Sequence, residues 1–140
     1  MDDVAYIALG SNVGDRDAHL SSARERIGAL DGVTVIAATP VEETAPVGPV
    51  AQRAFLNQML AARTSLGPRA LLDALHAIED AGGRERSVRW GPRTIDLDIV
   101  AFERATVSDP DLVVPHRELP NRDFWQRELA LLRRGTDRMR

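Results

Sequence analysis

The 140-residue chain contains neither cysteine nor lysine. The absence of cysteine excludes disulfides, thiolate zinc sites and cysteine nucleophiles. The absence of lysine excludes Schiff-base chemistry and the lysine of a P-loop. The chain therefore has 18 arginines and no other residue with a permanent positive charge. Each guanidinium group is planar and suited to binding carboxylates and phosphates.

Long apolar runs are also missing. No stretch approaches the roughly 18 apolar residues of a membrane span, and the acidic start, Met1-Asp2-Asp3, is unlike a secretory signal. We therefore expect a cytoplasmic protein with no membrane partner. The length fits one domain, residues 1–140. The basic tail at residues 133–140 could be disordered.

The hydrophobic pattern predicts the order strand, helix, strand, strand, helix, strand. This order is that of the split βαβ motif. The predicted fold class is therefore α+β: a ferredoxin-like βαββαβ sandwich, with a four-stranded antiparallel sheet and helices on one face. The strands are expected at residues 4–9, 33–41, 55–64 and 94–102, and the helices at residues 20–30 and 68–81.

Three connections are longer than this fold requires, at residues 42–54, 82–92 and 103–121. A hairpin needs only about two to five residues. Long loops on a compact sheet are more often functional than decorative, so we expect these loops to hold substrates.

The sharpest signal lies in the fourth predicted strand, in the run Thr94-Ile95-Asp96-Leu97-Asp98-Ile99. Because side chains alternate on a strand, Asp96 and Asp98 share one face, about 7 Å apart at Cα. Neighbouring carboxylates repel each other unless a positive group neutralises them, and Mg²⁺ typically takes one or two carboxylates plus phosphate oxygens. On alternation alone, solvated acids on a half-exposed strand are the slightly better interpretation.

An arginine-rich segment precedes this strand and contains Arg84, Arg86, Arg89, Trp90 and Arg93. Guanidinium groups bind phosphate oxygens bidentately. Beside a carboxylate metal site, such a segment suggests a polyphosphate held by metal on one side and arginine on the other. A solvated basic loop is the alternative. The glycine motifs of the commonest nucleotide-binding folds are absent.

Other side chains near the long loops could complete a site. His116 could donate to a phosphate oxygen, and Asn57 could recognise the polar edge of a flat heterocycle. Phe55, Trp90 and Phe124 could stack on such a ring. The alternatives are no special role for the histidine, backbone partners for the asparagine and core packing for the aromatic residues.

In these segments the sequence closely resembles the 6-hydroxymethyl-7,8-dihydropterin pyrophosphokinase family of folate biosynthesis. The run Arg89-Trp90-Gly91-Pro92-Arg93-Thr94-Ile95-Asp96-Leu97-Asp98 is its most specific piece. The other matching pieces, in order within residues 4–124, are Ala5-Tyr6-Ile7-Ala8-Leu9-Gly10-Ser11-Asn12, Thr44-Ala45-Pro46-Val47-Gly48-Pro49, Phe55-Leu56-Asn57, Gly83-Arg84-Glu85-Arg86, Val114-Pro115-His116 and Asn121-Arg122-Asp123-Phe124.

The resemblance implies transfer of pyrophosphate from ATP to the pterin hydroxymethyl group, with release of AMP. It implies ATP as co-substrate and two Mg²⁺ ions bound by Asp96 and Asp98. The implied catalytic set is Arg84, Arg86, Arg93, Asp96 and Asp98. The implied ATP-binding set is Glu79, Arg84, Trp90, Arg93, Ile99, His116 and Arg122. The implied pterin-binding set is Thr44, Pro46, Val47, Phe55, Asn57, Trp90, Asp96 and Phe124, with Phe55 and Phe124 on either side of the ring. The expected partners are these small molecules, without nucleic acid, on a monomer.

Some residues depart from the family pattern. Asp111 and Val113 stand where many members have an arginine and a threonine near the nucleotide, and His76 replaces a common glutamine. We expect these changes to affect ATP affinity more than the chemistry. The C-terminal segment also differs, and residues 125–132 predict a short amphipathic helix.

Two rival functions stay open. An RNA-binding module would need aromatic residues on the middle strands and usually a basic balance, whereas the net charge is -3 and the Asp96/Asp98 face is acidic. A catalytically weak or inactive homologue that binds pterin or nucleotide is harder to exclude, because of Asp111 and the altered C-terminal segment.

Overall fold

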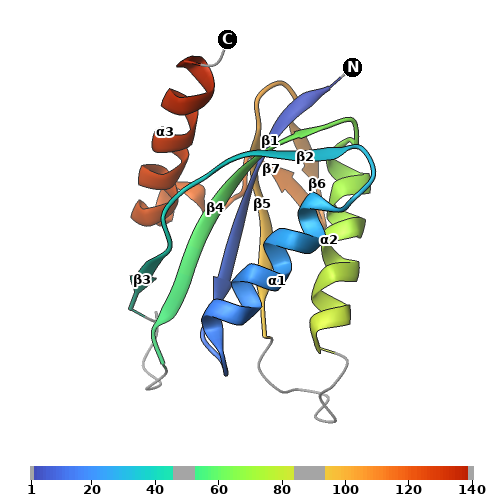
Figure 1. Ribbon diagram of the computed structural model, residues 1–140. Helices are drawn as coiled ribbons and strands as arrows, with labels where there is room; N and C mark the ends of the chain where they lie inside the picture. Colours follow the sequence, from blue (N-terminus) through green and yellow to red (C-terminus); the bar gives the residue numbers. More distant parts are fainter. Residues whose placement is uncertain (1, 46–52, 84–93, 139–140) are drawn as a thin grey trace.

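An antiparallel β-sheet forms the centre of the molecule (Figure 1). The computed structural model describes residues 2–45, 53–83 and 94–138. Within these residues the strand order is β2-β4-β1-β5, and β3 pairs with one end of β4. The strands are β1 (Asp3–Ser11), β2 (Val33–Ala38), β3 (Glu42–Thr44), β4 (Phe55–Thr64), β5 (Asp96–Phe102), β6 (Val107–Asp109) and β7 (Leu112–Val114). The helices are α1 (Arg16–Gly28), α2 (Pro68–Gly83), the 3-10 turn η1 (Leu119–Asn121) and α3 (Asp123–Arg138).

The strand order confirms the predicted ferredoxin-like α+β fold. The four predicted strands correspond to β1, β2, β4 and β5, and the two predicted helices, α1 and α2, lie on the same side of the sheet (Figure 1). Two of the long connections contain unpredicted elements, β3 in one and the β6–β7 hairpin in the other. Strands of three residues are too short for a hydrophobic period to reveal them.

Local signals explain where the helices begin. The Asp15 carboxylate accepts a hydrogen bond of 3.1 Å from the backbone N of Ala18 and so caps α1. Pro68 occupies the first position of α2. A backbone N–H at this position would have no partner within the helix, so proline is tolerated there.

The central strand β1 serves two cores, because helices cover both faces of the sheet. Ile7 and Leu9 face the core beneath α1 and α2, while Tyr6 and Ala8 face the opposite core. Every residue from Ala5 to Leu9 is therefore buried, and period-two alternation of polar residues is absent from β1.

The second face of the sheet is covered by α3 (Figure 1). Trp125, Leu129 and Leu132 recur at helical spacing and pack against this face. The sequence predicted a helix only at residues 125–132, yet α3 continues to Arg138, and no proline follows residue 120 to end it. In the described parts of the chain, no helix has the length and apolar character needed to span a membrane.

Candidate active site

Asp96 and Asp98 on β5 are shared by two cavities. Both carboxylates are partly exposed, whereas Leu97 between them is buried in the opposite core, so the predicted alternation is confirmed. The first cavity, of about 400 Å³, borders β5, the strand at one edge of the sheet, and is called the edge cavity below. The second, of about 690 Å³, is lined from the sheet face that α3 covers and is called the face cavity.

The floor of the face cavity is a row of residues across three strands. Gly10 on β1 pairs with Asn57 on β4 and with Asp96 on β5. Residues paired in this way point to the same face of a sheet. A Cβ atom at position 10 would lie 3.3 Å from Asn57 Oδ1, so glycine leaves space beside the amide. The Asn57 amide and the Asp96 carboxylate thus lie on either side of the space over Gly10. Their Cα atoms are about 10 Å apart, because two strand spacings separate them.

Two phenylalanines stand at the sides of this space. Phe55 begins β4 and Phe124 lies in the first turn of α3, and both half-buried rings line the face cavity. Asn57 Nδ2 donates a hydrogen bond to Thr44 Oγ1, which β3 brings beside β4. Of the predicted pterin set, Thr44, Phe55, Asn57, Asp96 and Phe124 therefore gather in one cavity.

The edge cavity lies between β5, α2 and the turn of the β6–β7 hairpin. Of the predicted nucleotide residues, Glu79, Ile99 and His116 line it together with Asp96 and Asp98. Three of the residues that depart from the family pattern also line it: His76, Asp111 and Val113. These three differences therefore fall on the wall of this cavity.

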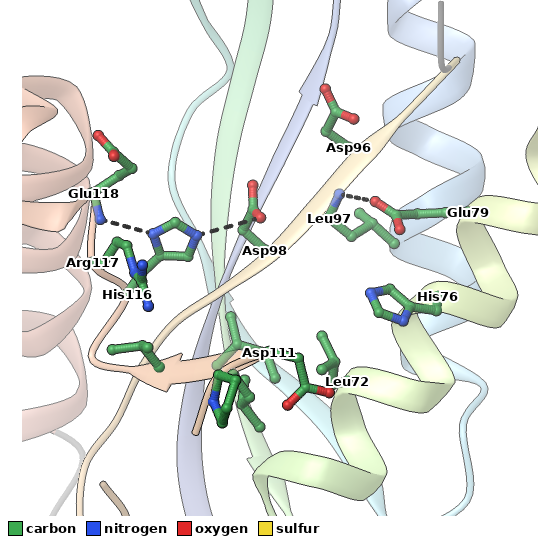
Figure 2. A pocket seen from close by; sticks show the side chains of 14 residues that line it. Leu72, His76, Glu79, Asp96, Leu97, Asp98, Asp111, His116, Arg117 and Glu118 are labelled. Atoms are coloured by element: carbon green, nitrogen blue, oxygen red, sulfur yellow. Dashed lines mark hydrogen bonds and ion pairs between the residues drawn. The ribbon is translucent and has the colours of Figure 1, made fainter. Parts of the chain in front are cut away.

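Glu79 joins α2 to the outer edge of β5. Its Oε2 accepts a hydrogen bond of 2.8 Å from the backbone N of Leu97 (Figure 2). An edge strand presents a row of backbone groups without a neighbouring strand, and the carboxylate satisfies one of them. Backbone groups alternate along a strand, so those of Ile99 point to the same edge as those of Leu97.

His116 reaches Asp98 from the loop that follows β7. Its Nε2 lies 3.6 Å from Asp98 Oδ1, and its Nδ1 accepts a hydrogen bond of 3.0 Å from the backbone N of Glu118 (Figure 2). A ring nitrogen that accepts a hydrogen bond carries no proton, so this pattern assigns the remaining proton to Nε2, facing Asp98. The backbone N of His116 donates to Val100 O at 2.8 Å and ties the loop to β5.

Arg122 and Trp125 line the face cavity together with the carboxylate pair. Arg122 lines the face cavity rather than the edge cavity, although the resemblance assigned it to ATP. Its Cζ lies 4.3 Å from the centroid of the Trp125 ring. Trp125 also lines the face cavity, and sequence reasoning missed it, because an apolar residue of an amphipathic helix indicates the core equally well.

An ion-pair cluster links α2 to the hairpin beside the edge cavity. Arg69 donates to Asp111 at 2.7 and 3.1 Å and to Asp109 at 2.9 Å. The Arg69 guanidinium holds the pKa of Asp111 below its usual range, and hydrogen bonding to Asp111 raises the pKa of Arg69. The negative charge of Asp111 is therefore locally neutralised. No sequence signal indicated this pairing, whose partners are 42 residues apart.

The carboxylate oxygens of Asp96 and Asp98 suit magnesium better than they suit a metal ion that is coordinated by protein side chains alone. Across residues 2–45, 53–83 and 94–138, no three or more His, Cys, Asp or Glu residues form a metal-binding group. Asp96 and Asp98 offer hard oxygen ligands where the two cavities meet. Mg²⁺ characteristically completes such a pair with phosphate oxygens and water.

Some predicted site residues fall outside the described residues, namely Pro46, Val47, Arg84, Arg86, Trp90 and Arg93. The role assigned to the arginine-rich segment therefore stays a prediction.

The fold and the site together define a class of protein. Two cavities on an α+β sandwich meet at one pair of carboxylates, which is the arrangement of an enzyme that brings two small substrates together. The family model of 7,8-dihydro-6-hydroxymethylpterin-pyrophosphokinase (HPPK) matches residues 6–134. The chain therefore belongs to this family, as the resemblance predicted.

Individual relatives agree with the family match. The chain is 45% identical over 130 residues to the 2-amino-4-hydroxy-6-hydroxymethyldihydropteridine pyrophosphokinase of Bacillus subtilis (strain 168), a match that covers 93% of this chain and 78% of that protein. It is 47% identical over 120 residues to the protein of the same name from Methylorubrum extorquens, covering 86% and 76% of the two chains. The Pseudomonas aeruginosa protein of that name is 41% identical over 125 residues, a match that covers 89% of this chain and 77% of that protein.

Proposed function

We propose that this chain transfers pyrophosphate from ATP to 6-hydroxymethyl-7,8-dihydropterin, releasing AMP, in folate synthesis. The observation that carries the proposal is the position of Asp96 and Asp98 on the boundary of two cavities. One cavity takes the nucleotide and the other takes the pterin, so the reacting groups meet at the carboxylates. Membership of the pyrophosphokinase family supports this assignment.

The pterin occupies the face cavity. Phe55 and Phe124 sandwich the bicyclic ring, which lies over Gly10 between Asn57 and Asp96. A pterin carries donors and acceptors around its edge, and the Asn57 amide and the Thr44 hydroxyl offer both kinds of partner. Pro46, Val47 and Trp90 complete this pocket in the proposal.

The nucleotide occupies the edge cavity. The backbone edge of β5 at Ile99 meets the base, and Glu79 holds that edge in place. His116, with its proton on Nε2, donates to a phosphate oxygen. Arg84, Arg93 and Arg122 contact the phosphates in this proposal, and Arg122 approaches them from the face cavity.

Asp96 and Asp98 would hold two magnesium ions, since carboxylate oxygens together with phosphate oxygens suit this metal. When bound, Mg²⁺ neutralises phosphate charge and makes the β-phosphorus more electrophilic. The residues of this chain then act mainly by positioning and charge stabilisation. Arg86 belongs to the catalytic set, and the long loops close over the substrates and exclude water as a competing acceptor.

The transfer needs no protein nucleophile. The hydroxymethyl oxygen attacks the β-phosphorus in line, and a new O–P bond forms. The bond between the β-phosphorus and the oxygen that bridges it to the α-phosphorus breaks, and AMP leaves with that oxygen. The hydroxyl proton is released, so atoms and charge balance without a covalent enzyme intermediate.

The first experiment is an AMP assay. AMP should form only when Mg²⁺, ATP and 6-hydroxymethyl-7,8-dihydropterin are all present, and product analysis should show pyrophosphate on the pterin. Folded protein that binds both substrates and forms no AMP would contradict the proposal and establish the alternative, a binding homologue without catalysis.

Substitution Asp98→Asn tests the role of the carboxylate pair. We expect kcat to fall at least about a thousandfold, because several kcal/mol of charge stabilisation in the transition state are lost. Asp73→Asn, at an exposed position of α2, is the matched control and should retain activity. Turnover near the wild-type rate in Asp98→Asn, with an unchanged circular dichroism spectrum, would remove the assignment.

A further inference from the structure

The buried indole of Trp125 connects groups from separate parts of the site. It is 3% exposed and packs on the sheet from α3. Its ring meets the imidazole of His116 nearly edge to face, with centroids 4.9 Å apart and planes at 85°. Arg122 Cζ lies 4.3 Å from its centroid, and the ring of Phe124 lies at 6.3 Å. One side chain thus touches a histidine, an arginine and an aromatic wall of the site.

The other constraints on His116 leave its ring orientation incompletely determined. Glu118 N donates to Nδ1 at 3.0 Å, while Nε2 is 3.6 Å from Asp98 Oδ1, which is longer than a good hydrogen bond. The indole packs against the imidazole at 85° and so restricts rotation about its outer torsion. Without the indole, Nε2 could turn away from Asp98.

Arg122 depends on the same indole. Within the described residues, no carboxylate forms an ion pair with its guanidinium, which lies over the face of Trp125. A guanidinium over an indole is attracted by the ring and keeps its N–H groups free for an anion. Trp125 therefore holds a positive charge on the wall of the face cavity without neutralising it.

We propose that Trp125 is a positioning residue for phosphate: its indole orients both His116, which lies beside Asp98, and Arg122, which lines the face cavity with the carboxylate pair. The inference rests on the proposed function for the identity of the phosphate, which is that of ATP. The competing explanation is that Trp125 only anchors α3, as its neighbours Leu129 and Leu132 do.

The first test reads the imidazole directly and needs no turnover. The chain has three histidines, so the His116 ring signals can be assigned by NMR with a His116→Gln variant. Trp125→Leu should shift these signals, because the ring current of the indole is lost. Leu132→Ala, in the same core, should leave them in place. Unmoved His116 signals in Trp125→Leu would overturn the inference.

The second test separates positioning from stability. Trp125→Leu should lower kcat/KM for ATP by about tenfold or more, since small misplacements of phosphate ligands are costly. Leu132→Ala serves as the control for destabilisation, and its kcat/KM for ATP should fall about twofold at most. Each variant is assayed at the same interval below its own Tm. Trp125→Phe keeps a ring and should recover part of the lost activity. Equal losses in Trp125→Leu and Leu132→Ala would show that Trp125 is only an anchor.

A binding measurement keeps this inference distinct from the proposed function. Inorganic pyrophosphate with Mg²⁺ is titrated into each variant by calorimetry. Trp125→Leu should bind it about tenfold more weakly than the wild type, and Leu132→Ala should bind it as the wild type does. If the wild type forms no AMP, the proposed function fails, whereas unchanged pyrophosphate affinity in Trp125→Leu would overturn the positioning role alone.

Discussion

Glu128 lies on the face of α3 that packs against the sheet, and 5% of its surface is exposed. Both carboxylate oxygens are buried, and neither has a hydrogen-bond partner of normal geometry among the described residues. Burial, reinforced by the neighbouring carboxylate of Glu42, raises the pKa of Glu128 to about 8. Arg127 opposes this shift and is itself paired with Glu42 at 3.2 Å. This shift favours the protonated, neutral form of Glu128 in the folded protein at neutral pH.

This shift predicts how stability depends on pH. A carboxyl group whose pKa is raised by folding stabilises the fold fully below its unfolded pKa, about 4.5. That contribution is lost as pH rises from about 4.5 to about 8, because the unfolded chain releases its proton first. Glu128→Gln, which stays neutral, should raise the free energy of unfolding at pH 8 by on the order of a few kcal/mol.

The measurement is urea denaturation of both proteins at pH 5 and pH 8.5. The difference between them should be larger at the higher pH. Glu25→Gln, at an exposed position of α1, is the control and should show no such dependence. An equal difference at both pH values would contradict the raised pKa.

At the scale of elements, the β6–β7 hairpin is held against α2 by Arg69. The hairpin pairs Val107 to Asp109 with Leu112 to Val114, and its turn carries Asp111 on the wall of the edge cavity. The two carboxylates converge on one guanidinium, so the cluster is a network rather than a single exposed pair. We infer that this network keeps the wall of the edge cavity in place.

Arg69→Gln should therefore loosen the hairpin. Amide hydrogen exchange in β6 and β7 should become faster, and the KM for ATP should rise by roughly a few-fold with kcat little changed. The effect should shrink at high salt, which already screens exposed charges. Arg133→Gln, which breaks an exposed pair with Glu103 that lines neither cavity, is the control. Unchanged exchange in the hairpin would argue against the clamp.

At the scale of the whole molecule, two cavities border different parts of the sheet and meet at Asp96 and Asp98. The face cavity lies on the sheet face that α3 covers, and the edge cavity lies between β5 and α2. β1 ends while β4 and β5 begin at the same end of the sheet, far from both chain termini (Figure 1). Three strands can therefore contribute Gly10, Asn57 and Asp96 to one site.

This division predicts that binding at each cavity can be weakened separately. Asn57→Ala should raise the KM for the pterin about tenfold, the cost of roughly one lost polar contact, while the affinity for a non-hydrolysable ATP analogue stays unchanged. His76→Ala should have the converse effect, because His76 lines only the edge cavity. Steady-state kinetics and calorimetry measure both. A joint loss in each variant would show that the cavities are not independent.

The sequence by itself predicted the main strands, the two helices on one face and the shared face of Asp96 and Asp98. Each of these depends on local rules, namely the period of apolar residues and the residues that begin or end a helix. The family motif likewise indicated Phe55, Asn57 and Phe124, which meet in the face cavity. These signals lie within runs of consecutive residues, so they need no knowledge of the fold.

The remaining features depended on contacts between distant residues. Arg69 and Asp111 are 42 residues apart, and the loop that carries His116 is tied to Val100. Trp125 meets His116 only because α3 returns across the second face of the sheet. The pKa of Glu128 likewise depends on what covers it. Burial and side-chain contacts between separate elements exist only after packing, so the tertiary structure alone decided how these groups meet.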